Sequence, residues 1–201
     1  MMPLLVVPIA YLLGAIPFGY LLVRMTTGED VRSSGSGNIG ATNVLRTTGR
    51  IAAIATLLLD IAKGYFAVWL AGRMTDESAF WMSLAALAVM AGHAYPVFLK
   101  FRGGKAVASL VGAFACLTPW AMLAVVPIFV VTVAWTGHIS MGSIVGAAVL
   151  PLAVWLMMQP PMIVFVASVV AGLFIIWRHG ENIARLRQGT ENRFRFGSPK
   201  R

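Results

Sequence analysis

Four glycine-rich, polar segments interrupt an otherwise apolar sequence, and their side chains are of types that bind phosphate. The first segment, residues 33–46 (SSGSGNIGATNVLR), combines glycines, neutral hydrogen-bond donors and a terminal arginine. Glycine-rich turns can expose successive backbone N–H groups to an anion, and a guanidinium can bind two phosphate oxygens at once. The candidate ligands in this segment are Ser36, Gly37, Asn38, Thr42, Asn43 and Arg46. A flexible Gly/Ser loop without a ligand is the alternative interpretation.

The second segment, residues 92–109 (GHAYPVFLKFRGGKAVAS), has two glycines and a lysine directly before an expected helix. Backbone N–H groups and the helix dipole favour a bound anion at such a position. The segment is not a Walker A loop, because that motif requires glycine at position 99 and Ser or Thr at position 106, where this chain has Leu99 and Ala106. For Lys100 and Arg102, simple anchoring at the membrane surface is an equally good explanation. The candidate ligands are His93, Gly103, Gly104 and Lys105.

Two further polar segments follow, at residues 138–143 (HISMGS) and 178–194 (RHGENIARLRQGTENRF). In a helix, residues three or four apart share a face, so Asn182 lies on one face with Arg185 and on a neighbouring face with His179. Their side chains are therefore able to point back toward the apolar helices. The candidate ligands are Ser140, Ser143, His179, Asn182 and Arg185. A solvated basic tail is the alternative for Arg187 and for the residues beyond Arg193.

Asp60 and Lys63 lie one helical turn apart within an apolar run. Ionised side chains inside a membrane are energetically costly and face the interior of a helix bundle. Two interpretations remain open: a mutually neutralising structural pair, or a substrate-binding role for Lys63.

The composition excludes an ordinary soluble domain. The chain has 201 residues, of which 59% are hydrophobic and 11% charged, and its mean hydropathy is +0.82, whereas soluble domains carry about 25% charged residues. Each membrane span needs about 20 apolar residues. We therefore expect an all-α, polytopic membrane bundle forming one domain over residues 1–201. Its seven expected spans cover about residues 3–23, 51–72, 79–99, 105–118, 120–137, 142–158 and 162–178.

The division of one long apolar run decides the expected topology. Residues 107–137 are too long for one comfortable span, and Thr118, Pro119 and Trp120 suit a tight turn at a membrane surface. With seven spans, one side receives every Lys and Arg except Arg73 and the intramembrane Lys63. The basic tail, including Arg195, Lys200 and Arg201, falls on that same side.

The positive-inside rule places this basic side in the cytoplasm, so the N-terminus is expected outside and the C-terminus inside. All four polar segments then open to the cytoplasmic side of a bacterial inner membrane. Because the charges flank apolar runs, the net charge of +9 is explained by topology, and no nucleic-acid partner is expected.

Four motifs, SGSGNIGATNVLR, DIAKG (residues 60–64), GHAYPVFLKFRGGKAVAS and RHGENIARLRQGTE, together resemble the bacterial acyl-phosphate:glycerol-3-phosphate acyltransferase family. The resemblance covers nearly the whole chain in order. It implies transfer of a fatty acyl group from acyl phosphate to the 1-hydroxyl of glycerol-3-phosphate. The products are lysophosphatidic acid and phosphate, in the first step of phospholipid synthesis. The catalytic residues implied are Ser36, Arg46, Lys105, His179 and Asn182, and Glu191 resembles a structural residue.

Two departures from the family pattern fall in the second segment. Where the family usually has glycine after the lysine and threonine three residues later, this chain has Ala106 and Ser109. Both affect only the fine geometry of the loop.

Because acyl phosphate is an activated mixed anhydride, positioning and charge neutralisation can carry the reaction without a metal, cofactor or covalent intermediate. The general base stays open between His179 and a substrate phosphate oxygen. The expected partners are the two substrates and membrane lipid, with functional coupling to the enzymes that form acyl phosphate and acylate the product. A transporter of phosphorylated solutes is the alternative, although no inverted repeat is visible.

Overall fold

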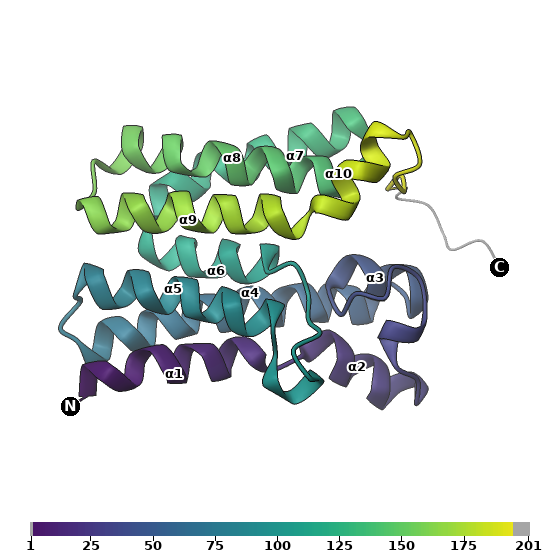
Figure 1. Ribbon diagram of the computed structural model, residues 1–201, viewed down its shortest axis with the longest axis horizontal. Coiled ribbons are helices and arrows are strands. Elements are labelled where there is room, and N and C mark those ends of the chain that lie inside the picture. Colours follow the sequence, from purple (N-terminus) through teal and green to yellow (C-terminus); the bar gives the residue numbers. More distant parts are fainter. Residues whose placement is uncertain (1, 195–201) are drawn as a thin grey trace. The chain divides into compact units, whose positions relative to one another are not determined.

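The computed structural model describes residues 2–194, and every regular element among them is a helix (Figure 1). The expectation of an all-helical protein is confirmed for this part of the chain. Arg195, Lys200 and Arg201, which the charge pattern included, lie outside the described residues. The chain divides into two compact units, the first ending at Cys116 and the second beginning at Leu117. That the whole chain forms one membrane domain stays a prediction.

The first unit contains three long helical segments and the first two polar segments of the sequence. Helix α5 packs against α1 and α4, and the short α3 packs on α4 (Figure 1). The elements of this unit are α1 (Met2–Ala15), α2 (Phe18–Thr27), η1 (Val31–Ser33), α3 (Ala41–Thr47), α4 (Arg50–Met74), α5 (Ala79–Ala94), η2 (Val97–Leu99) and α6 (Val107–Leu117).

The first expected span is interrupted between α1 and α2. Pro17 has no N–H to donate to a helical hydrogen bond, and the Phe18 N–H donates instead to the Ile16 carbonyl, two residues back, at 3.2 Å. The helix resumes at Phe18 and continues to Thr27, four residues beyond the predicted end of the span. This break places the backbone of Ile16 within reach of side chains from other helices.

Small residues bring the helices of the first unit into backbone contact. A Cβ atom added to Gly14 on α1 would overlap the Val89 carbonyl on α5, and one added to Gly92 on α5 would overlap the Tyr11 carbonyl. Gly112 on α6 meets the Ile61 carbonyl of α4 in the same way. Glycines at such crossings are typical of membrane helices, which gain no hydrophobic driving force from associating and depend on close packing.

Large apolar side chains face outward instead. Leu58 on α4 is 60% exposed, while Ala85, Ala86 and Val89 on α5 are fully buried. Large apolar residues outside and small residues inside are the pattern expected of a bundle surrounded by lipid.

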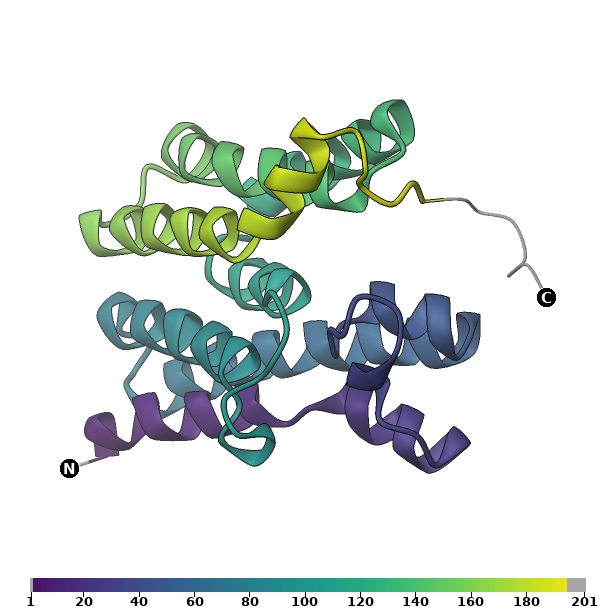
Figure 2. The ribbon, with the colours of Figure 1, turned by 45° about the vertical axis from the view of Figure 1, so that its right-hand side comes forward.

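The second unit contains three long helices and a short one (Figure 2). Helix α8 packs against both α7 and α9, and Gly172 on α9 lies against the Ala147 carbonyl on α8. The chain bends by 56° between α9 and α10. The helices of this unit are α7 (Pro119–Thr136), α8 (Ile139–Met158), α9 (Met162–Arg178) and α10 (Gly180–Arg187).

Five helical segments among the described residues are long and apolar enough to cross a membrane. The bent pair of α9 and α10 would make a sixth span, and α6, with 11 residues, is shorter. Helix α6 ends at Leu117 and α7 begins at Pro119, at the break expected from the sequence. The count of seven spans and the orientation of the termini stay predictions.

The α4–α6 crossing should not tolerate a methyl group. We expect Gly112→Ala to lower the free energy of unfolding by about 1–3 kcal/mol, because the new Cβ must displace the backbone at Ile61. Thermal unfolding of the purified protein in detergent measures the change. Gly180→Ala is the control, since no heavy atom lies within 4 Å of its added Cβ and the melting temperature should stay within about 2 °C of the wild-type value. Equal melting temperatures for both variants would contradict the proposed close contact.

Candidate functional site

The first polar segment is organised around the buried side chain of Asn43 on α3. Its Oδ1 accepts a hydrogen bond from the Ser36 N–H at 2.8 Å. Its Nδ2 lies within hydrogen-bond distance of three loop carbonyls, those of Val31 (3.0 Å), Ser34 (3.1 Å) and Asn38 (2.8 Å). One amide thus closes the loop onto the helix that follows it, and its own polar atoms are directed to the loop backbone.

Two of the candidate ligands in this segment, Ser36 and Arg46, are exposed, whereas Asn43 is buried. Gly35 and Gly37 have positive φ angles of 62° and 67°, and they flank the exposed Ser36. Asn38 Oδ1 accepts from the Gly40 N–H at 2.8 Å and tightens the turn before α3. Arg46 is exposed one helical turn after Asn43. The sequence pattern predicted the residue types, while the structure shows which of them maintain the loop and which face outward.

An apolar cluster joins the first polar segment to the second. Ile39 and Val44 of the first segment, and Val31 just before it, pack in one buried cluster with Leu99 of η2, and the cluster also includes Val23 and Ala53. Leu99 follows Val44 by 55 residues and Val31 by 68, so only the tertiary fold brings them together.

The glycines of the second segment lie directly on His93. The Gly103 N–H donates to the Ala94 carbonyl at 3.2 Å and the Gly104 N–H donates to the His93 carbonyl at 3.0 Å. A Cβ atom on Gly103 would overlap the His93 carbonyl oxygen, and one on Gly104 would overlap Nε2 of the His93 ring. Both amides already donate to protein carbonyls, so the observed role of these glycines is to let the backbone approach His93 closely. The half-buried Lys105 follows directly.

Ala106 occupies a backbone conformation that favours glycine. Its φ is +61° and its side chain is fully buried, just before α6 begins at Val107. The left-handed region costs an L-residue roughly 1–2 kcal/mol. The glycine that the family usually has at this position therefore has a physical reason, and this chain carries some strain in its place.

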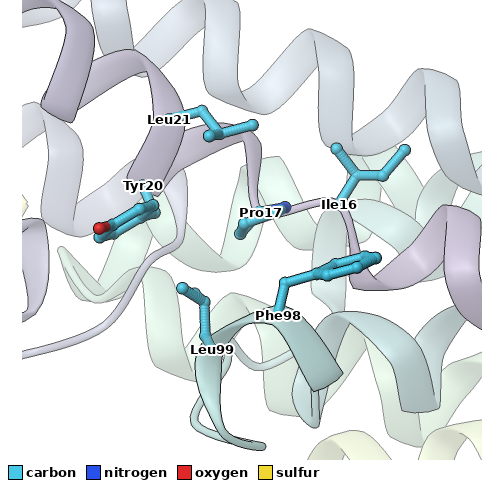
Figure 3. Close-up of a pocket in the computed structure, with 6 residues that line it drawn as sticks. All are labelled: Ile16, Pro17, Tyr20, Leu21, Phe98 and Leu99. Atoms are coloured by element: carbon cyan, nitrogen blue, oxygen red, sulfur yellow. The ribbon is translucent and has the colours of Figure 1, made fainter.

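Lys63 is buried and paired. Its Nζ lies 2.8 Å from Asp60 Oδ1 and donates to the Ile16 carbonyl at 2.8 Å, at the break between α1 and α2. An apolar cavity of about 320 Å³ adjoins this break, where Ile16 and Pro17 face Phe98 of η2 (Figure 3). Its other lining residues are Tyr20, Leu21 and Leu99.

In the second unit, Glu191 joins three of the candidate residues. Its Oε1 accepts from Ser140 Oγ at 2.8 Å and Asn182 Nδ2 at 2.6 Å, and its Oε2 accepts from Arg185 Nε at 2.7 Å. Burial favours a higher pKa for Glu191, but the hydrogen bonds from Arg185, Asn182 and Ser140 and the charge of Arg185 outweigh it and hold the pKa below its usual range. The carboxylate stays ionised and fixes the side chains around it.

His179 lies at the bend between α9 and α10 and is buried. Its Nδ1 is 2.8 Å from the Ile175 carbonyl, an acceptor, so Nδ1 carries the hydrogen and, in the neutral ring, Nε2 is the acceptor nitrogen.

Ser143 Oγ donates to the Ile139 carbonyl at 3.0 Å, within its own helix. Among residues 2–194 no group of three or more His, Cys, Asp or Glu side chains is arranged to hold a metal ion.

Comparison with known proteins identifies the family. The family model described as glycerol-3-phosphate acyltransferase matches residues 4–189. Curated glycerol-3-phosphate acyltransferases from Geobacter sulfurreducens and Geobacter metallireducens are 45% and 49% identical to this chain. The first match covers 96% of this chain and 97% of the relative, and the second covers 92% and 94%. The chain belongs to the glycerol-3-phosphate acyltransferase family.

Solved structures agree with this assignment. The acyltransferase is similar to PlsY, described as an integral membrane glycerol 3-phosphate acyltransferase, in its glycerol 3-phosphate form. The TM-score is 0.92 at 35% identity, over 97% of this chain and 96% of that one. The lysophosphatidic acid form of PlsY matches with a TM-score of 0.89 and 33% identity. The expected resemblance and the membrane nature of the protein are thereby confirmed.

Two organising residues of the acyltransferase were not recognised from sequence in these roles. Asn43 appeared as a substrate donor, but its polar atoms hold the loop. Asp60 appeared only as the partner of Lys63, but its Oδ1 also lies 3.6 Å from His93 Nδ1 on another helix. The signal in the sequence was the position of an acidic residue within an apolar run, where an ionised side chain is energetically costly.

The strain at Ala106 should be visible in glycine substitutions. We expect Ala106→Gly to leave the free energy of unfolding within about 0.5 kcal/mol of wild type, because release of the left-handed strain offsets the lost methyl and the added backbone entropy. Ala108→Gly, in the helix that follows, should cost about 1 kcal/mol. Thermal unfolding of both variants in the same detergent provides the comparison. A loss at Ala106 as large as that at Ala108 would show that no strain is present.

The cluster around Glu191 should depend on its carboxylate. Glu191→Ala leaves the buried donors of Asn182 and Ser140, and the partly exposed guanidinium of Arg185, without this acceptor, and we expect it to cost about 1–3 kcal/mol of stability. Glu181→Ala is a matched control, because the Glu181 side chain is 90% exposed and lies 3.8 Å from Arg185; surface pairs contribute about 0–1 kcal/mol. Unfolding measured by circular dichroism separates the two variants, and equal effects would contradict the central role of Glu191.

Proposed function

We propose that this protein transfers a fatty acyl group from acyl phosphate to the 1-hydroxyl of glycerol-3-phosphate. The products are 1-acylglycerol-3-phosphate and inorganic phosphate, in the first step of phospholipid synthesis. The observation that carries the proposal is the match to an integral membrane glycerol 3-phosphate acyltransferase over 97% of the chain. The basic and glycine-rich segments support it, because both substrates are phosphate-bearing anions.

The reaction proceeds in one displacement. The 1-hydroxyl oxygen forms a bond to the acyl carbonyl carbon, the carbon–oxygen bond to the phosphate breaks, and phosphate leaves with the electron pair. The hydroxyl proton passes to His179 or to a phosphate oxygen. An acyl phosphate is already activated, so holding the two substrates and neutralising their charges are the main tasks of the protein.

The proposed roles follow from the chemistry of each side chain. Arg46, Lys105 and Arg185 neutralise phosphate charge, and Ser36 and Asn182 donate hydrogen bonds to substrate oxygens. His179 is the candidate base, because its Nε2 is the acceptor nitrogen in the neutral ring. The remaining proposed contributors line or shape the binding segments: Gly37, Asn38, Thr42, Asn43, Gly103, Gly104, Ser140 and Ser143.

The topology proposal accompanies the function. Seven spans with the N-terminus outside would place the four polar segments at the cytoplasmic face of a bacterial inner membrane. There they meet a water-soluble acceptor and a membrane-bound donor. The neighbouring steps are an enzyme that forms acyl phosphate and one that acylates the lysophosphatidic acid.

Donor specificity provides the first test. Purified protein should convert labelled glycerol-3-phosphate to labelled lysophosphatidic acid with a long-chain acyl phosphate, releasing one phosphate per product, and should be inactive with coenzyme A or carrier-protein thioesters. Activity only with a thioester would contradict the proposed donor. Uptake of glycerol-3-phosphate into vesicles without turnover would favour a transporter.

Lysine variants test the site itself. We expect Lys105→Ala to lower kcat/KM by about 10²–10³-fold, because a charged donor to a substrate phosphate is lost. Lys100→Ala is the matched control, five residues earlier and exposed, and it should retain activity within about threefold, as surface charges contribute little. Equal effects of the two substitutions would remove Lys105 from the site. In the same assay, His179→Ala with near-normal turnover and pH profile would exclude the histidine base.

A further inference from the structure

Four polar side chains from three helices meet in the buried part of the first unit. Asp60 and Lys63 come from α4, His93 from α5 and Ser109 from α6, and all four are less than 5% exposed. His93 Nδ1 lies 3.6 Å from Asp60 Oδ1 and 3.3 Å from Ser109 Oγ. Ser109 is brought close because Gly64 on α4 lies against its backbone carbonyl.

Lys63 connects this group to the break in the first span. Its ammonium lies between Asp60 Oδ1 and the Ile16 carbonyl, each 2.8 Å away, and 5.6 Å from the centre of the Phe18 ring. Both contacts at 2.8 Å are with protein groups. An orienting role is therefore the simplest explanation for this buried ammonium.

His93 connects the same group to the glycine loop. One edge of its ring faces Asp60 and Ser109, while Nε2 lies directly against Gly104. Its backbone carbonyl accepts the Gly104 N–H at 3.0 Å. A rotation or shift of His93 must therefore move Gly104, and Lys105 is the next residue.

A buried ion pair is a poor source of stability, because apolar replacements of similar shape are often as stable or more so. The pair also contacts His93 on α5, the Ile16 carbonyl at the α1–α2 break and the Phe18 ring. Stability alone therefore does not explain why these two charges are buried here. We infer that Asp60 and Lys63 are positioning residues that hold His93, and through it the Gly103–Gly104 backbone, in the geometry that presents Lys105 to a substrate phosphate. This inference rests on the proposed function and deepens it: Lys63 and His93 act on the substrate through the loop.

The inference makes a specific kinetic claim. Positioning of Lys105 affects the binding of an anion in both the ground state and the transition state, so its loss appears in KM more than in kcat. A purely structural pair, once replaced by neutral residues in a folded protein, leaves both constants unchanged.

The test uses the double variant Asp60→Asn/Lys63→Met in the full-length protein. It removes both charges while keeping side chains of similar size, so no unpaired charge is buried. Thr56→Val is the matched control, because Thr56 is fully buried one turn earlier on α4 and its hydroxyl donates only to the Ala52 carbonyl of its own helix at 2.8 Å.

Two measurements are made on each protein: steady-state kinetics with acyl phosphate and glycerol-3-phosphate, and hydrogen exchange of the peptide covering residues 100–106. For the double variant we expect a rise of at least tenfold in KM for one or both substrates, a fall in kcat of less than threefold, and faster exchange of the Gly103 and Gly104 amides. Thr56→Val should match wild type in both measurements.

The inference is overturned if the folded double variant keeps the wild-type KM values, or if its Gly103 and Gly104 amides exchange hydrogen at the wild-type rate. If the double variant does not fold, Asp60→Asn alone, which keeps the shape of the side chain and the Lys63 bond to the Ile16 carbonyl, is measured in the same two ways and judged by the same outcomes. Absence of transfer by the wild-type protein would instead refute the proposed function, and the exchange measurement would then decide the positioning role by itself.

Discussion

A buried polar group must find a partner within the protein, because it has given up its hydrogen bonds to water. Three side chains meet this requirement by collecting several partners at once: Asn43, Asp60 and Glu191. Asn43 binds the backbone of its own loop, Asp60 lies beside Lys63 and His93, and Glu191 accepts from three side chains. Each fixes a short segment of backbone or a group of side chains.

Close packing of the helices allows these polar side chains to reach one another. Glycines at the α1–α5 and α4–α6 crossings bring backbones into contact, so side chains from three helices can reach one another. The same closeness explains why Gly103 and Gly104 are glycines, since His93 occupies the space that side chains would need. Strain at Ala106 is a cost of ending that loop directly at α6.

The residues that organise the polar segments are thereby separated from the exposed residues proposed to bind substrate. The amide of Asn43 and the carboxylates of Asp60 and Glu191 are directed to protein atoms, whereas Ser36 is exposed on the first loop and Arg46 on α3. For the proposed reaction, which joins two anions, such rigid support is a physical advantage, because charged donors must be held in place before the substrates arrive. The family assignment is consistent with that division of roles.

The amino-acid sequence by itself determined the helical membrane character, the residue types of the polar, glycine-rich segments and the family, because these depend on apolar run lengths and on local motifs. It also marked the helix break at Thr118. The break at Pro17 was not predicted, because an apolar run continues through it. The contact of Lys63 with Ile16 and that of His93 with Ser109 were decided only by tertiary structure, since they join residues 47 and 16 positions apart. Side-chain type shows what a group can bind, and the packing of helices decides whether protein or substrate is within its reach.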